Sequence, residues 1–221
     1  LRNQRLVSDI GELAAVQVDW DTGSVAITSR SLAARGVTIW DDTGRGDALT
    51  ERLRRRTVTT GCGQGTVFGD LMDEIDRLPL PAGATLTRAA LYDLLDRVRL
   101  HETIYKQSGA VHGCGLATNA GDASEILMFV EDVGRHNAVD AIAGRMWLDR
   151  LDGGDKVFYT TGRLTAEMVI KGAQMGIPFL VSRSGLTQMG HDIAKKVGMT
   201  MIGRATNRHF LLFTGAERFV A

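Results

Sequence analysis

The sequence predicts an α/β protein, in which helices pack on the faces of a sheet that contains parallel strands. From residue 110 onward, short apolar runs alternate with longer runs of helical period. Glycine and proline end several of these runs, as at Gly176, Pro178 and Gly198. Alternating strands and helices are typical of β-α-β units, because parallel neighbours need a crossover between them. With 221 residues, the chain is long enough to bury a substantial core.

The N-terminal part of the chain is expected to contain a β-hairpin. Alternating β-rich runs at residues 13–19 and 24–29 flank Asp21-Thr22-Gly23, which is typical of a turn. Further along, Thr87 is a suitable N-cap for a helix over residues 88–100. The remaining predicted strands are 110–118, 125–131, 156–160, 179–182, 200–202 and 210–213, and the remaining predicted helices are 135–147, 165–175 and 187–197.

Pro79, Pro81 and Gly83 mark a boundary between two parts of the chain. We expect an N-terminal lobe over residues 1–82, with the hairpin and a mobile, glycine-rich cysteine loop, and an α/β core over residues 83–221. Because the chain begins at Leu1 rather than at methionine, we also expect that some N-terminal sequence is missing.

Composition narrows the class of protein. The 26 basic and 26 acidic residues balance, so the chain as a whole gives no electrostatic reason to bind nucleic acid or an anionic membrane. No run in the given sequence is long enough to span a bilayer, and we expect no signal peptide. Two cysteines are too few for a disulfide framework, which predicts a reducing, cytoplasmic location.

The most informative segment is the decapeptide from residue 131 to residue 140, Glu-Asp-Val-Gly-Arg-His-Asn-Ala-Val-Asp. It joins an apolar, strand-like run to a helix-like run. An acidic pair, a glycine and then Arg135, His136 and Asn137 therefore stand where a strand gives way to a helix. Strand ends and helix N-termini aim backbone N–H groups into a crevice, so this placement predicts a binding site.

Two later turns have a similar character. Residues 160–165 and 182–187 are rich in hydroxyl groups and glycine, carry an arginine, and precede predicted helices. Free N–H groups, hydroxyls and a guanidinium suit a phosphate, so the turns predict a phosphorylated ligand across the strand ends. Ordinary N-capping by Thr165 and Thr187 is the simpler interpretation. The polar loop over residues 203–210 is either a further phosphate or base contact or merely a hairpin tip.

Cys62 is the candidate nucleophile. Glycines flank it, and arginines 52, 54, 55 and 56 precede it, so the sulfur is sterically open and nearby cations favour the thiolate. The alternative is an incidental loop cysteine beside a solvated basic face.

His112 and Cys114 would share one face of a strand. Together with Cys62 and His136 they could be imagined as four zinc ligands, but no characteristic ligand spacing supports a metal site. Cys114 is better interpreted as a small buried residue. A functional role is favoured for His112.

These motifs, in this order, resemble the formate dehydrogenase accessory sulfurtransferase family, FdhD/NarQ. The similarity extends over nearly the whole chain, and the decapeptide at 131–140 is its most specific part. The matching segments are Thr60-Gly61-Cys62-Gly63, Ser108-Gly109-Ala110-Val111-His112, residues 131–140, residues 162–169 with Lys171, and Ser182-Arg183-Ser184-Gly185-Leu186-Thr187.

The resemblance implies a fold similar to cytidine deaminase, with a mixed sheet sandwiched by helices and without the deaminase zinc. It implies a homodimer that takes sulfur from a cysteine desulfurase, carries it as a persulfide on a loop cysteine, and passes it to the molybdenum cofactor of formate dehydrogenase. That cofactor, molybdenum bis(molybdopterin guanine dinucleotide), would be a bound substrate, and no structural metal is expected. Its guanine nucleotide ends would bind near the loop 205–210.

The chain departs from the family pattern in two places. The family usually has Cys-Gly-x-Cys-Gly in the loop, whereas this chain has Gly65 in the position of the second cysteine, so a relay between two loop thiols is ruled out. A carrier with a single cysteine remains chemically sufficient, because sulfane transfer needs one nucleophilic thiolate. Arg204 stands where an aromatic residue is common in the family.

We therefore expect a cytoplasmic sulfurtransferase with Cys62 as its catalytic residue. Two alternatives stay open: a non-catalytic chaperone that binds the molybdenum cofactor, and a zinc-dependent hydrolase related to the deaminases. The expected cofactor-binding residues are His112, Asp132, Gly134, Arg135, His136, Arg163, Ser184, Ala205, Thr206, Asn207, Arg208, His209 and Phe210.

Overall fold

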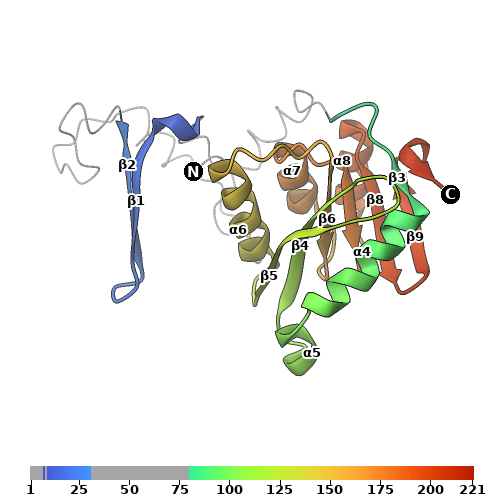
Figure 1. Cartoon of the computed structure of the whole chain (residues 1–221), viewed down its shortest axis with the longest axis horizontal. Coiled ribbons are helices and arrows are strands. Elements are labelled where there is room, and N and C mark those ends of the chain that lie inside the picture. The colour runs from blue at the N-terminus through green and yellow to red at the C-terminus, as the bar shows by residue number, and fades with distance from the viewer. Residues whose placement is uncertain (1–6, 8, 31–79) are drawn as a thin grey trace. The chain divides into compact units, whose positions relative to one another are not determined.

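The computed structural model describes residues 7, 9–30 and 80–221 (Figure 1). The chain divides into two compact units, Leu1–Phe68 and Gly69–Ala221. The boundary that the sequence predicts, between residues 82 and 83, stays a prediction. Cys62 and the glycine-rich loop around it lie outside the described residues.

The described part of the first unit is a hairpin preceded by a short 3-10 helix, η2 (Ile10–Glu12). Strands β1 (Leu13–Asp19) and β2 (Ser24–Ser29) pair antiparallel, with Val18 opposite Val25. The turn is held by Asp19, whose Oδ1 accepts hydrogen bonds from the N–H groups of residues 21 and 22 at 3.0 and 3.2 Å. Gly23 completes it with a φ of +63°, which glycine adopts without strain. The predicted hairpin is confirmed.

Within residues 80–221, a six-stranded mixed sheet runs in the order β5-β4-β6-β7-β8-β9. Strands β6, β7 and β8 are parallel, and the remaining neighbours are antiparallel. A parallel pair of two-residue strands, β3 (Leu86–Thr87) and β10 (Phe219–Val220), lies apart from this sheet. The strands of the main sheet are β4 (His112–Thr118), β5 (Ile126–Asp132), β6 (Lys156–Thr160), β7 (Phe179–Ser182), β8 (Thr200–Thr206) and β9 (His209–Thr214).

Helices cover both faces of this sheet, so the predicted α/β class with a mixed, helix-sandwiched sheet is confirmed. Helix α4 lies on one face, and α6, α7 and α8 lie on the other (Figure 1). None of the described helices is long and apolar enough to cross a lipid bilayer. The elements are α4 (Arg88–His101), α5 (Ile104–Ser108), α6 (Arg135–Leu148), α7 (Ala166–Gln174), α8 (Gln188–Val197) and the 3-10 helix η4 (Ala216–Arg218).

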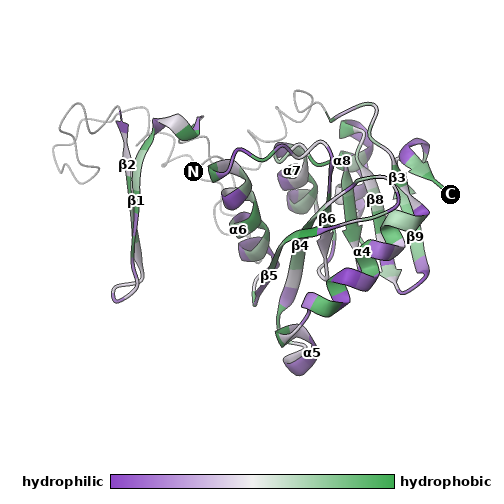
Figure 2. Ribbon diagram, viewed as in Figure 1, coloured by the Kyte–Doolittle hydropathy of each residue, from purple (hydrophilic) through white to green (hydrophobic). Residues whose placement is uncertain are grey.

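Alternation along the strands builds a core on each face. Val157, Phe179 and Ile202 point toward α4 and pack with its residues Leu91 and Leu94, all almost completely buried. Figure 2 shows both apolar and polar residues along α4, whose buried residues are Ala90, Leu91, Leu94, Leu95 and Val98. On the other face, register aligns four buried apolar residues of adjacent strands beneath α6, α7 and α8: Leu116, Phe158, Leu180 and Met201.

Two predicted features of the element series are corrected. The sequence predicts no helix at 104–108, yet α5 forms there; five residues are too few to show a periodic pattern. The final strands extend beyond the predicted 200–202 and 210–213, because a register shift between Gly203 and Thr206 lets pairing continue to the turn. Arg204 and Asn207 take positive φ values of 53° and 54° at this irregularity, and polar residues there mask the strand signal.

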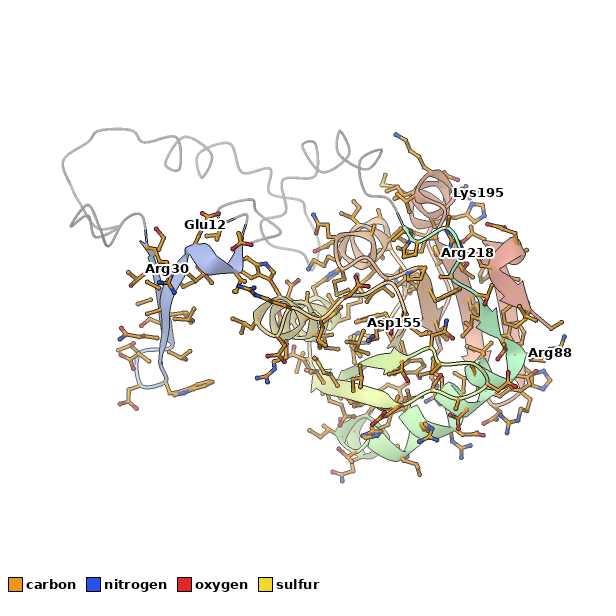
Figure 3. The ribbon with its side chains drawn as sticks, turned by 45° about the horizontal axis from the view of Figure 1, so that its top comes forward. Glu12, Arg30, Arg88, Asp155, Lys195 and Arg218 are labelled. Carbon is orange, nitrogen blue, oxygen red and sulfur yellow. The ribbon has the colours of Figure 1, made fainter. Side chains whose placement is uncertain are left out.

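The C-terminus is tied to the beginning of the described core. Arg218, labelled in Figure 3, is buried and donates from Nη1 to the carbonyl oxygens of Pro81 and Ala82. Nearby, β10 pairs with β3, so the last strand lies beside the residues that lead into α4. The N-terminal end of α4 is therefore fixed from outside the helix as well as by its own cap.

We expect Thr87→Ala to destabilise the protein by about 1 kcal/mol, because Thr87 Oγ1 caps α4 by accepting from Ala90 N at 3.0 Å. Denaturant unfolding followed by circular dichroism would measure this. Thr87→Ser keeps the hydroxyl and is the matched control. Equal stability of the alanine and serine variants would contradict a capping role.

Candidate functional site

The ends of β5, β6, β7 and β8 and the beginning of β4 lie at one edge of the sheet, here called the carboxyl edge. This follows from the pairing, since β4 is antiparallel to β5 and β6, whereas β6, β7 and β8 are parallel. Ligands of open α/β sheets bind at such edges because strand ends and helix N-termini converge there. Side chains alternate along a strand, so the carboxyl edge presents different residues to α4 than to α6 and α7.

On the side of α6, Asp132 shapes the turn that begins this helix. Its Oδ1 accepts hydrogen bonds from Gly134 N at 2.7 Å and from Asn137 Nδ2 at 3.0 Å. A Cβ atom at position 134 would lie 3.2 Å from that amide nitrogen, so glycine keeps the turn tight. Asp132 and Gly134 thereby fix the point at which Arg135 leaves the turn.

Arg135 and His112 meet against the turn that follows β6. A Cβ atom at Gly162 would lie 2.8 Å from Cδ of Arg135 and 3.4 Å from Nδ1 of His112, so glycine permits their close approach. Thr161 Oγ1 accepts from Gly113 N at 3.0 Å and lies 3.5 Å from Nδ1 of His112. Burial, followed by the charge of Arg135, lowers the pKa of His112. The imidazole is therefore biased toward its neutral form.

Arg163 and Ser184 were also expected in this region. Arg163 is exposed on the turn after β6. Ser184 is half-buried, and its N–H donates to Ser182 Oγ at 2.9 Å while its carbonyl accepts from Arg204 N at 2.8 Å. Within the described part of the chain, Nε of Arg135 is buried without a hydrogen-bond partner.

The prediction of free backbone N–H groups in the two glycine-containing turns is wrong for several of them. Gly162 N donates to Thr160 Oγ1 at 3.1 Å. Leu164 N donates to Gly185 O at 3.0 Å, and Thr187 N donates back to Leu164 O at 3.1 Å. The turns hydrogen-bond to each other because they follow adjacent parallel strands. These donors are therefore already used and do not form an open phosphate cradle.

Only one of the two expected threonine caps forms. Thr187 Oγ1 accepts from Gly190 N at 3.2 Å and caps α8. Thr165 makes no capping hydrogen bond to α7, so this part of the prediction is wrong. Ser182 supplies a different support, donating from Oγ to Gly162 O at 2.6 Å and thereby joining the turns after β6 and β7.

His136 lies between α6 and α7 and is almost completely buried. Its Nδ1 is 3.3 Å from Oε1 of Glu167 without hydrogen-bond geometry, so this contact is electrostatic. Lys171, also buried, lies 3.1 Å from Glu167 and 2.8 Å from Asp140. The ion pairs of Lys171 with Glu167 and Asp140 join two adjacent helices, and His136 packs beside them. His136 thus stabilises the helix pair behind the turn, and its expected contact with a ligand stays a prediction.

Cys114 shares a face of β4 with His112, as the alternation predicts, but is completely buried. Its Sγ lies 3.3 Å from Thr160 Oγ1. Burial raises the pKa of the Cys114 thiol to about 11. Cys114 is therefore a protonated core residue at neutral pH. Among the described residues, no cluster of three or more His, Cys, Asp or Glu side chains is arranged to hold a metal ion.

On the α4 side of the carboxyl edge lies a cavity of about 470 Å³. Its wall carries three cationic side chains, Arg99, Lys106 and Arg183, against one carboxylate, Glu102. Aromatic side chains lie beside these charges. Such a mixture suits a ligand that has both an anionic group and a flat ring. The lining residues are Leu95, Arg99, Glu102, Tyr105, Lys106, Gly109, Tyr159, Arg183, Ala205, Thr206 and Asn207.

Arg183 is held by two neighbours, Glu102 and Tyr105, and Tyr159 supports the first of them. Its Nη1 donates to Oε2 of the buried Glu102 at 3.3 Å, and its guanidinium lies 5.3 Å from the centre of the Tyr105 ring. Tyr159 OH donates to Oε1 of the same carboxylate at 3.1 Å. Burial, followed by the charge of Glu102, raises the pKa of Tyr159, which stays a donor. Arg183 is 40% exposed, so its orientation is fixed while part of its guanidinium faces solvent.

The predicted nucleotide loop at residues 205–210 divides between two locations. Ala205, Thr206 and Asn207 line the cavity, and Asn207 Oδ1 accepts from Arg99 at 3.5 Å. The other residues hold the β8–β9 turn against α4 or face solvent. Arg208 lies 4.8 Å above the centre of the Tyr92 ring and forms an ion pair with Asp96. Phe210 packs on Tyr92 and Phe219. His209 is exposed.

The sequence predicts the arginine of the turn 182–187 as a phosphate contact but does not place Arg183 in this cavity, and it gives no indication of Glu102 or Tyr105. The signal for Arg183 was present, because it lies between Ser182 and Ser184 at a strand end and alternation places its side chain on the side opposite to theirs. Glu102 ends α4 outside any motif, and α5, which carries Tyr105, gave no periodic signal. Only the fold brings these three together.

The described core is thus a mixed α/β sandwich with a cationic, partly aromatic cavity at its carboxyl edge. A model of the FdhD/NarQ family matches residues 1–220. The chain belongs to the FdhD/NarQ family.

Relatives carry the name "Sulfur carrier protein FdhD". That of Wolinella succinogenes is 27% identical over 218 residues, covering 99% of this chain and 70% of its own length. That of Sulfurisphaera tokodaii is 33% identical over 174 residues, with coverages of 78% and 65%, and that of Nocardia farcinica is 34% identical over 170 residues, with coverages of 74% and 59%. The chain thus spans about two thirds of the length of the curated relatives it matches.

A solved structure has the same fold. A chain from Desulfotalea psychrophila, described as a candidate formate dehydrogenase accessory protein, superimposes with a TM-score of 0.67 at 25% identity. The match covers 99% of this chain and 75% of that one. The fold of the FdhD/NarQ family therefore agrees with the mixed sheet found here.

We expect stability to fall as the pH drops below about 6.5, the ordinary pKa of histidine. Burial, with Glu167 opposing it, lowers the pKa of His136, and the pKa of His112 is lowered too. As the pH falls, these histidines are therefore protonated in the unfolded chain before they are protonated in the folded protein. Their contribution to stability is fully present above the unfolded pKa and is lost as the pH falls through the folded pKa. Denaturant unfolding between about pH 8 and about pH 5.5 would measure the slope.

His136→Gln should flatten that slope, whereas His209→Gln, at an exposed position, should leave it unchanged. A slope in His136→Gln equal to that of the unchanged protein would contradict the assignment of this pH dependence to His136.

Cys114 should resist alkylation in the folded protein, because its thiol is buried and its pKa is raised to about 11. Iodoacetamide labelling of Cys62→Ser, followed by mass spectrometry, would isolate Cys114. We expect modification only after denaturant is added. Rapid labelling under native conditions, with unchanged circular dichroism, would show that Cys114 is accessible.

Proposed function

We propose that this protein is a sulfurtransferase that passes sulfur from a cysteine desulfurase to the molybdenum cofactor used by formate dehydrogenase. Membership of the FdhD/NarQ family and the sulfur-carrier name of its relatives support the class. The observation that carries the proposal is the cavity around Arg183. Its fixed guanidinium, additional cations and aromatic walls match the phosphate and the ring of a nucleotide.

In this proposal the cavity binds a guanine nucleotide end of the cofactor, molybdenum bis(molybdopterin guanine dinucleotide), which is the substrate. Arg183, Arg99 and Lys106 would attract its phosphates. Thr206 and Asn207 would offer polar contacts at the opposite wall. The cavity wall carries more positive than negative side chains. This excess of positive charge supports the assignment, because a wall without net charge would not attract a phosphorylated ligand.

The cluster on the opposite face of the carboxyl edge would serve the same substrate in a different way. Arg135 has a buried Nε without a partner among the described residues, and the neighbouring His112 favours the neutral imidazole. A guanidinium and a neutral imidazole side by side can hold an anionic group and exchange a proton with it. Asp132 and Gly134 would position this pair through the turn that they build.

Cys62 would carry the sulfur. Its thiolate would attack the outer sulfur of the desulfurase persulfide, and the desulfurase thiolate would leave. The Cys62 thiolate would in turn be released when the outer sulfur moves to the substrate. The arginines at positions 52, 54, 55 and 56 would favour the thiolate and attract an anionic partner. We further propose that the protein acts as a cytoplasmic homodimer, with the desulfurase and formate dehydrogenase as partners.

One alternative has an observation of its own. Gly65 stands where the family usually has a second loop cysteine, so no thiol is available there to resolve a persulfide. This favours, as a second candidate, a chaperone that binds the molybdenum cofactor and delivers it without transferring sulfur. The two functions share the cavity and differ at Cys62.

Incubation with a cysteine desulfurase and cysteine should add one sulfur atom to Cys62, because a loop thiolate beside cations is a sulfane acceptor. Intact-mass and peptide mass spectrometry would detect a gain of about 32 Da that dithiothreitol removes. Cys62→Ser should lose this gain, and Cys114→Ser, altered at a buried thiol, should keep it.

The two candidate functions give different results in this experiment. Sulfur on Cys62 supports the sulfurtransferase. If no sulfur is added to the protein, and if Cys62→Ser binds the cofactor as well as the unchanged protein does, the results instead support the chaperone.

A further inference from the structure

Glu131, the first residue of the decapeptide at 131–140, faces away from the Asp132 turn and toward α5. Its Oε1 accepts from Tyr105 N at 2.8 Å, and its Oε2 accepts from Ile104 N at 3.0 Å. Thr103 donates to the same carboxylate from its N–H at 3.2 Å and from its hydroxyl at 2.8 Å. The carboxylate therefore receives the first N–H groups of a helix that lies far from it in the sequence.

The carboxylate of Glu131 supplies hydrogen-bond acceptors to the first N–H groups of α5. The helix has five residues, and its N-cap residue Thr103 makes no side-chain capping hydrogen bond. Helices this short are unstable alone, and their first N–H groups need acceptors. Burial opposes ionisation of Glu131, but hydrogen bonds from the backbone of Tyr105 and Ile104, with those of Thr103, lower its pKa below the usual value. A negative charge at the N-terminal end also suits the helix dipole.

Helix α5 forms one wall of the Arg183 cavity. Tyr105, Lys106 and Gly109 all line it. The Tyr105 ring lies beneath the guanidinium of Arg183, 5.3 Å from it. Because Tyr105 N is the shortest backbone contact of Glu131, the carboxylate fixes the backbone of the residue that supports Arg183.

We propose that Glu131 is a positioning residue for ligand binding: it holds α5 so that Tyr105 orients Arg183 in the cavity. The proposal rests on the assignment of this cavity to a nucleotide. It extends that assignment by giving the two adjacent acidic residues separate tasks. Glu131 organises the cavity on the α4 face, while Asp132 organises the turn before Arg135 on the other face.

The test uses Glu131→Gln in the full chain. The amide group retains one acceptor oxygen, loses the charge and brings an NH2 group toward the N–H donors. Hydrogen–deuterium exchange at residues 103–105 should accelerate by about tenfold or more, and the affinity for the probe GDP should fall by roughly tenfold. Glu125→Gln, an exposed position just before β5, is the matched control and should change neither quantity.

A thermodynamic cycle with Tyr105 separates positioning from a general loss of stability. If Glu131 acts through Tyr105, Glu131→Gln should weaken GDP binding no further once Tyr105→Ala is present. Additive losses would overturn the proposal, as would unchanged exchange in Glu131→Gln or faster exchange with unchanged GDP affinity. If the unchanged protein does not bind GDP, the nucleotide assignment fails. The exchange data and the orientation of Arg183, followed by its side-chain NMR signal, then decide the role of Glu131 on their own.

Discussion

The buried carboxylate of Glu102 is the interaction on which the carboxyl edge depends. It is 2% exposed, and an ionised group so deeply buried is costly unless charges and donors surround it. Arg183 and Tyr159 supply these partners, from the turn after β7 and from β6. Because Glu102 also ends α4 through its own N–H to Val98 O, one residue links a helix, a strand and a turn. The cavity forms in the angle between them.

Strand alternation then explains why the edge has two different faces. Ser182 joins the turns after β6 and β7 on the α7 side, whereas the next residue, Arg183, lines the cavity. The same rule separates Glu131 from Asp132. A cluster of polar residues that is continuous in sequence is thereby split into two sites that share a backbone. Changes at one site can reach the other only through that backbone or through the core.

The sequence predicts most of the fold, because each parallel strand contains a short apolar run and Thr87 and Gly198 mark helix ends. It also predicts that the residues at 132–135 form a turn. It does not predict the cavity, since Glu102, Tyr105 and Arg183 come from separate elements and α5 is stabilised by a distant carboxylate. The expectation of open N–H groups fails because adjacent turns satisfy each other, which is a tertiary effect.

In the proposed function, substrate binding and sulfur transfer depend on different residues. This separation bears on whether a single loop cysteine is sufficient for sulfur transfer. Sulfane transfer needs a thiolate, a donor persulfide and a leaving group, and none of these steps requires a second protein thiol. Cys114 is unsuited to take part, because it is buried and protonated at neutral pH. In the proposed function, substrate selection would then rest on the cavity around Arg183 and on the turn before Arg135, which Glu102, Glu131 and Asp132 hold in place. In the proposed function, Gly65 in the place of the second loop cysteine would remove one way of resolving a persulfide on Cys62, whereas the residues that line the cavity around Arg183 include no cysteine.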